Sequence, residues 1–124
     1  MSSNGPAYYT AQISLALNED WIVPFIFSNA DGTPIDLSDS ILRLQIRNTD
    51  TDPHPIVSLS SINSNGIVIS NALNGEFTVI IARGNQLLRA NSSYVCDLVR
   101  LNTNNEIQDR LFAGVANVTL GVTR

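Results

Sequence analysis

The stretch WIVPFIFSNADGTPIDLSDSILRLQIR, residues 21–47, decides the fold of this chain. It begins with an apolar run of aromatic and β-branched residues over 21–27 and ends with alternating apolar and polar residues over 41–47. A turn sequence rich in Asp, Gly and Pro separates the two runs. The pattern predicts two β-strands joined by a long turn, lying in one sheet or in one sandwich.

The first of these strands has two apolar faces. One face carries aromatic and aliphatic side chains and the other carries isoleucine: Trp21, Val23, Phe25 and Phe27 against Ile22 and Ile26. Proline cannot donate a ladder hydrogen bond, so Pro24 predicts that the strand lies at a sheet edge, is bulged, or is unpaired there. A strand with two apolar faces in an otherwise alternating chain is also a candidate for coverage by another chain.

Further short strand patterns follow at spacings near ten residues, with turn signals between them. They cover 10–17, 56–60, 67–69, 76–82, 93–101 and 107–122, and Gly114 is expected to mark a bulge or bend in the last. Residues 84–90 form the only plausible helix, about two turns long. Seven to nine short strands predict an all-β antiparallel sandwich, with a small barrel as the alternative. We expect a flexible arm over 1–9 and a single sandwich domain over 10–124.

Composition excludes several classes of function. The chain has 124 residues, which is enough for one domain that folds without disulfides or a metal. A net charge of -4 argues against nucleic-acid binding. No apolar run approaches the roughly 20 residues of a membrane span, and we expect no signal peptide. All seven basic residues are arginine, so the chain has no lysine for Schiff-base chemistry or for a P-loop.

No set of residues in the sequence suggests catalysis. Paired carboxylates, a Gly-x-Ser-x-Gly sequence, a phosphate loop and a Cys/His cluster are all missing. Asp50, Asp52 and His54 alternate in one loop, as ligands do in calcium loops. No acidic residue closes the set, however, and two prolines stiffen it, so we expect a solvated loop. The chain is predicted to be a non-enzyme without a cofactor or a metal.

Two single residues invite a functional interpretation. Cys96 lies in an apolar strand pattern far from the only histidine, which predicts a buried and inert thiol. Trp21 follows Glu19 and Asp20, and an aromatic platform beside carboxylates would suit a sugar. Because Trp21 begins an apolar strand, we expect it in the core or between sheets instead.

Two groups of side chains are candidates for specific contacts. Aromatic residues are favoured at protein interfaces, and the candidate interface residues are Tyr8, Tyr9, Trp21 and Phe25. Asp97 is a carboxylate among the apolar residues of its strand. We expect it to form a structural ion pair, in the strong forked geometry, rather than to act as a catalytic acid. Its candidate partners are Arg43, Arg47 and Arg100.

The order of these motifs resembles the immunoglobulin-like N-terminal domain of phage baseplate upper proteins and related small tail-region proteins. Those sequences run from an apolar strand through Asp-Gly-Thr-Pro-x-Asp-Leu-Ser/Thr into an alternating strand that ends in Arg. A Gly-Ile strand, a Gly-x-aromatic-Thr strand, a Leu-rich turn, Tyr-x-x-Asp-Leu and Arg-Leu-x-x-Gly then follow. The matching segments here are 21–27, 31–38, 42–47, 66–69, 75–78, 87–88, 94–98 and 110–114. The likeness covers roughly 11–122, and the long C-terminal region of full baseplate proteins has no counterpart.

The resemblance implies a non-enzymatic structural or adaptor protein of a phage or prophage virion, in the tail or baseplate and made in the bacterial cytoplasm. It implies an immunoglobulin-like sandwich in which Trp21, Asp31, Gly32, Asp97 and Arg110 are fold residues. We expect other virion proteins as partners, a homo-oligomer, and no nucleic acid or membrane contact. The alternative is a carbohydrate- or host-receptor-binding β-sandwich, which needs an exposed aromatic residue.

Overall fold

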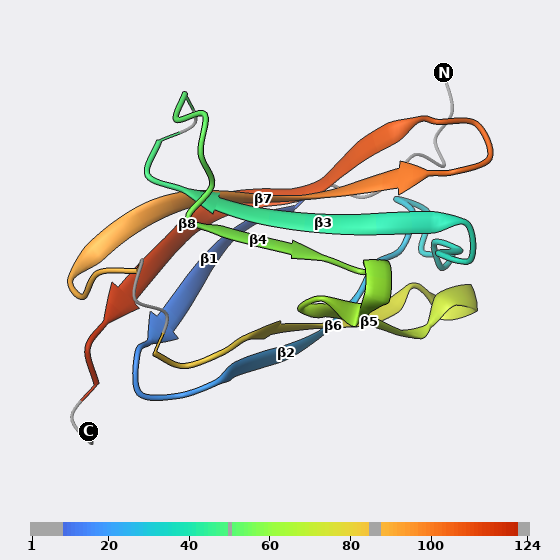
Figure 1. Ribbon diagram of the computed structural model, residues 1–124. Coiled ribbons are helices and arrows are strands. Elements are labelled where there is room, and N and C mark those ends of the chain that lie inside the picture. The colour runs from blue at the N-terminus through green and yellow to red at the C-terminus, as the bar shows by residue number, and fades with distance from the viewer. Residues whose placement is uncertain (1–8, 50, 85–87, 122–124) are drawn as a thin grey trace.

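Two β-sheets pack face to face in the computed structural model, which describes residues 9–49, 51–84 and 88–121 (Figure 1). The five-stranded sheet has the order β1-β8-β7-β3-β4 and the three-stranded sheet the order β2-β6-β5. The strands are β1 Tyr9–Ala16, β2 Trp21–Ile26, β3 Ser40–Arg47, β4 Val57–Ser60, β5 Ile67–Asn71, β6 Glu76–Ile81, β7 Ser92–Asn102 and β8 Gln108–Thr119. Two short 3₁₀ turns, η1 Ile62–Ser64 and η2 Ala72–Asn74, flank β5.

The predicted all-β sandwich is confirmed, and its strand order is that of an immunoglobulin fold. β2, β6 and β5 take the places of strands B, E and D, while β3, β7 and β8 take those of C, F and G. β4 adds a further strand beside β3, as in variable-type domains. One strand pair departs from the antiparallel expectation, because β1 runs parallel to β8. Of the helix expected over 84–90, residues 84 and 88–90 are not helical, and residues 85–87 are outside the described part.

The start of β7 carries a second immunoglobulin feature. Tyr94 is 3% exposed, and its hydroxyl oxygen accepts a hydrogen bond of 2.8 Å from the backbone N–H of Arg89. This is the tyrosine corner of immunoglobulin-like domains, in which the tyrosine stands two residues before the second disulfide cysteine. Cys96 occupies that place, but as the only cysteine of the chain it has no partner.

Phenylalanine rings pack between the two sheets and join them. Phe77 on β6 is fully buried, and its ring centroid lies 5.4 Å from those of Phe25 and Phe27. Phe25 in turn lies 5.9 Å from Phe112 on β8, in the opposite sheet. Stacked rings of this kind stabilise a core beyond the area that they bury. The inner faces of the strands around them follow the predicted alternation, with Leu42, Leu44, Ile46, Val79, Ile81 and Leu98 all buried.

The loop between β2 and β3 closes one end of the sandwich. Ile35 and Leu37 are 3% and 1% exposed, so they belong to the core although they lie outside any strand. The Ile35 N–H donates to the Phe27 carbonyl, and the Leu37 N–H donates to the Ala72 carbonyl at 2.8 Å. The segment expected to be a long turn therefore closes this end of the core as a plug, and hydrogen bonds hold it to the end of β2 and to η2.

Two aspartates shape this plug from the solvent side. The hydroxyl and backbone N–H of Thr33 both donate to Asp31 Oδ1, at 2.7 and 3.0 Å. Ser38 binds Asp36 Oδ1 in the same way, at 2.6 and 2.8 Å. In each case the side-chain hydrogen bond, supported by the backbone one, holds the pKa of the carboxyl group below its usual range. The Asp-Gly-Thr and Asp-Leu-Ser sequences are thus two turns that cap themselves.

The last strand bulges at Leu111 rather than at Gly114. Leu98 pairs with Phe112 and Val99 pairs with Arg110, which leaves Leu111 as the extra residue. Leu111 and Phe112 are adjacent in sequence and both buried, which regular alternation would not allow. Gly114 pairs in regular register with Cys96, so the expected bulge at Gly114 was wrong.

Candidate interaction surfaces

β2 turns its aromatic face inward. Trp21 and Phe25 are half-buried, pack against the core, and have ring centroids 6.3 Å apart. The exposed apolar side chains of this strand are Ile22 and Ile26, at 58% and 68%. Of the other candidate interface residues, Tyr9 begins β1 and pairs with Phe112 through the backbone, so it is not part of an arm. Tyr8 and the side chain of Tyr9 lie outside the described part.

The outer face of the three-stranded sheet forms what we call the apolar surface. It consists of Ile22, Pro24 and Ile26 on β2, Thr78 and Ile80 on β6, and Val68 on β5. The pairing register brings these residues side by side, with Ile22 opposite Ile80 and Thr78 between Pro24 and Val68. Glu76, opposite Ile26, is the charged residue at its end. Contiguous exposed apolar residues of this kind mark sites of protein contact.

The free edge of β2 is protected although its face is apolar. The Phe27 N–H continues the ladder by donating to the Gly75 carbonyl at 3.0 Å. Because these directions alternate along a strand, the backbone N and C=O of Pro24 face the open edge. Proline offers no donor there, so Pro24 discourages pairing with a further strand. The expected edge position of this strand is confirmed. Because Pro24 disfavours pairing at the edge, a partner would contact β2 through its exposed face.

The outer face of the five-stranded sheet is charged, and we call it the arginine face. It holds two adjoining open hollows of about 280 and 310 Å³, which share Gln45, Arg47 and Asp97. Arg110 lines the first hollow and Arg43 the second. Three of the seven arginines of an acidic chain are therefore gathered on one sheet face.

Arg47 is held in place on this face. Its Nη1 donates to the Asp52 carbonyl and its Nη2 donates to Gln45 Oε1, both at 2.6 Å. These bonds tie β3 to the loop that follows it. Guanidinium has five N–H donors, so the fixed side chain keeps capacity for an acceptor from outside.

Arg100 pairs with Asp109, not with Asp97. The Arg100 Nη2 to Asp109 Oδ2 distance is 2.7 Å, across the β7–β8 hairpin. Asp97 and Arg100 are three residues apart on one strand, so their side chains leave opposite faces of the sheet. Arg43 and Arg47 do share a face with Asp97, but they stand diagonal to it, opposite Val99 and Val95. Among the described residues no ion pair joins Asp97 to any of these three arginines.

The other sequence candidates have structural partners. Asp20 forms an ion pair with Arg83 at 3.5 Å and also accepts the Arg83 N–H. Asp52 Oδ1 accepts the His54 N–H, while Asp50 is outside the described part. Residues 9–49, 51–84 and 88–121 contain no group of three His, Cys, Asp or Glu side chains that could hold a metal ion.

Cys96 should react slowly with thiol reagents as long as the protein is folded. Burial, followed by the negative charge of Asp97, raises the pKa of the thiol to about 11. At pH 8 its thiolate fraction is then about a hundredfold lower than that of an unfolded cysteine. We expect labelling by a disulfide reagent at pH 8 to be slower by at least this factor than labelling in denaturant. Equal rates under the two conditions would show that the thiol is exposed.

No family model matches the chain, and no curated protein matches it. The part of the chain that the structure describes also has no helix of the length and apolar character needed to cross a membrane. The structure shows that the protein is an all-β sandwich with two distinct outer faces, one apolar and one rich in arginine.

Proposed function

We propose that this protein is a non-enzymatic structural or adaptor protein that acts through protein–protein assembly in a phage or prophage virion, at the tail or baseplate. The observation that carries the assembly role is the apolar surface, whose Ile22 and Ile26 are more than half exposed. Leaving such side chains in water is unfavourable, and a partner that covers them recovers the cost. The virion setting is supported by the resemblance in the order of motifs.

The alternative function, carbohydrate or receptor binding, is less well supported. It needs an exposed aromatic platform, and Trp21 was the residue expected to supply it. Trp21 instead packs against Phe25, and the neighbouring Asp20 is engaged with Arg83. We therefore favour assembly over glycan recognition.

The assembly role is tested by replacing Ile22 and Ile26 together with arginine. We expect the unaltered protein to have a mass in light scattering that is a multiple of 13.5 kDa. The double variant should have a lower mass than the unaltered protein, because two buried charges would have no partners in the interface. Circular dichroism should show that its sheet content is unchanged, since both side chains point away from the core.

The matched control is Ile62→Arg, which changes another exposed isoleucine, 46% exposed and outside the apolar surface. It should leave the mass unchanged. A mass that the double substitution leaves unchanged would contradict assembly through this surface. The virion setting has its own test, in which peptides of this chain should follow purified particles through a density gradient. Their loss from the particle fraction would contradict that setting.

A further inference from the structure

Three arginines gather on one sheet face of this chain, and five carboxylates gather at one end of the sandwich. The arginine face carries Arg43, Arg47 and Arg110, and Asp97 is the one carboxylate that lines its hollows. The chain as a whole is acidic, with a net charge of -4. A net positive face on an acidic protein calls for a negatively charged neighbour.

Five carboxylates gather at one end of the sandwich, which we call the acidic end. They are Asp31, Asp36, Asp39, Glu76 and Glu106. The β2–β3 and β7–β8 connections carry four of them and the start of β6 carries Glu76, and these three parts of the chain meet at the right-hand end of the molecule in Figure 1. Hydrogen bonds join the connections, from the Leu37 N–H to the Ala72 carbonyl and from the Thr103 N–H to the Asp39 carbonyl, both 2.8 Å. The two ion pairs among described residues are Arg83–Asp20 and Arg100–Asp109, so neither neutralises this end.

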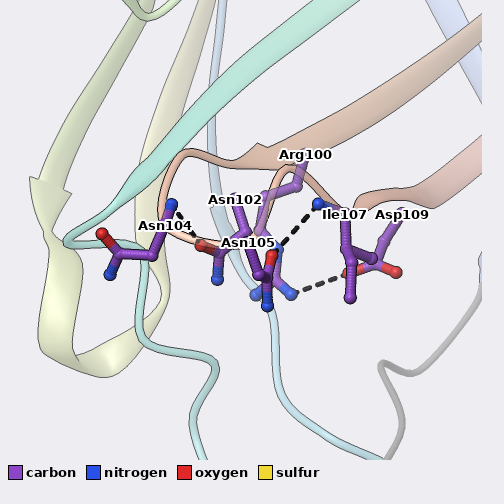
Figure 2. Close-up of polar contacts among 6 residues, drawn as sticks. All are labelled: Arg100, Asn102, Asn104, Asn105, Ile107 and Asp109. Atoms are coloured by element: carbon purple, nitrogen blue, oxygen red, sulfur yellow. Dashed lines mark hydrogen bonds and ion pairs between the residues drawn. The ribbon is translucent and has the colours of Figure 1, made fainter.

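The acidic end is also well ordered by its own polar contacts. Figure 2 shows the β7–β8 hairpin, in which Asn102 Oδ1 accepts the Asn104 N–H at 2.9 Å and Asn105 Oδ1 accepts the Ile107 N–H at 3.0 Å. The Asn104 side chain reaches across to Asp39 Oδ2 at 2.8 Å. Glu106 on this hairpin and Asp39 bound to it should therefore lose less conformational entropy on binding than carboxylates of a loose loop.

We propose that the arginine face of one chain binds the acidic end of a second copy. This inference rests on the proposed function, because it names one partner in the assembly. The two patches lie at different places on the molecule, so the contact is heterologous and repeats from copy to copy until it closes a ring or extends as a filament. The apolar surface lies on the opposite sheet and stays available to a different neighbour.

The contact should weaken as salt is raised. At about 0.1 M ionic strength the screening length is about 10 Å, which damps repulsion between whole acidic chains but not attraction between touching charges. At about 1 M the length falls to about 3 Å, and the contact itself is screened. Light scattering should therefore show a mass above 13.5 kDa at the lower salt concentration that decreases at the higher one.

Charge reversal on each patch locates the contact. Arg43→Glu on the arginine face, and Asp39→Lys with Glu106→Lys on the acidic end, should each weaken self-association at least about tenfold. The matched controls reverse exposed charges elsewhere, with Arg89→Glu for the first variant and Glu19→Lys for the second. Both controls should associate as the unaltered protein does. An equal mixture of the two patch variants should form a pair with twice the 13.5 kDa mass of one chain, because the intact arginine face of one variant binds the intact acidic end of the other and no further contact remains.

The possible outcomes separate this inference from the proposed function. A mass that does not change with salt, equal behaviour of Arg43→Glu and Arg89→Glu, or no recovery on mixing would overturn the inference. The assembly role would still stand in each case if Ile22 and Ile26 control the mass. A single chain that binds a poly-glutamate peptide through Arg43 would also overturn it, since the occupant would then be a different acidic protein.

Discussion

Replacing Phe77 with alanine should lower the free energy of unfolding by about 3–5 kcal/mol. Phe77 is fully buried and stacks on both Phe25 and Phe27 from the neighbouring strand. Its loss would leave a cavity between the sheets, beside the ring pair that reaches Phe112 on β8. Cys96 is the only cysteine and is free, so no disulfide joins the two sheets to limit the damage.

The effect is measured by denaturant unfolding, followed through Trp21 fluorescence. Leu73→Ala is the control, because Leu73 is 69% exposed and its truncation should change stability by less than about 0.5 kcal/mol. Similar losses in the two variants would show that the phenylalanine cluster is not the centre of the core.

Replacing Gly75 with alanine should cost at least about 2 kcal/mol of stability. Gly75 has a φ of +70°, a left-handed conformation that is unfavourable for alanine. The added Cβ would also press on the backbone carbonyl oxygen of Phe27 and lie 2.9 Å from that of Ile35. Both carbonyls belong to the connection that plugs the end of the sandwich, so relief of the clash must disturb the plug.

Gly32→Ala separates the two parts of this cost. Gly32 also has a positive φ, of +92°, but its added Cβ would have no atom within 4 Å. It should therefore be destabilised by the backbone strain alone, and thermal unfolding should place it between Gly75→Ala and the unaltered protein. If Gly32→Ala is as unstable as Gly75→Ala, the close approach at Gly75 contributes nothing to the loss of stability.

Alternation in the sequence predicts much of this sandwich. Leu42, Leu44 and Ile46 were expected inside and are fully buried, and the strand around Cys96 has the expected inner face. Pro24 predicted a sheet edge, because a proline without an N–H can be accommodated where no ladder partner needs one. These predictions succeed because they depend on one strand at a time.

The features that the sequence did not predict depend on two segments at once. The sequence placed Ile35 and Leu37 in a turn. They are core residues because that loop docks on η2. The bulge at Leu111 is a matter of register between β7 and β8. The pairing of Arg100 with Asp109 likewise requires the hairpin register, although the three-residue spacing alone could have excluded Asp97.

The sequence predicted which strand carries the candidate surface on β2, but not which face of that strand is exposed. The sequence shows two apolar faces, and the choice between them depends on which one the opposite sheet covers. The larger aromatic side chains go inward, which leaves Ile22 and Ile26 outside. The arginine face needs three strands in register, so it has no signature in any single stretch.

The pairing of β1 with β8 bears on how this protein is made. Ile13 and Leu15 on β1 are buried, and the Thr119 hydroxyl donates to the Leu15 carbonyl across a separation of 104 residues. Ribosomes add about 5–20 residues per second, so β1 waits on the order of ten seconds for a partner strand to be synthesised. The edge of the larger sheet can form only after the chain is nearly complete. During translation the nascent chain therefore exposes an apolar strand that chaperones, or a neighbouring chain on the same messenger, could bind first.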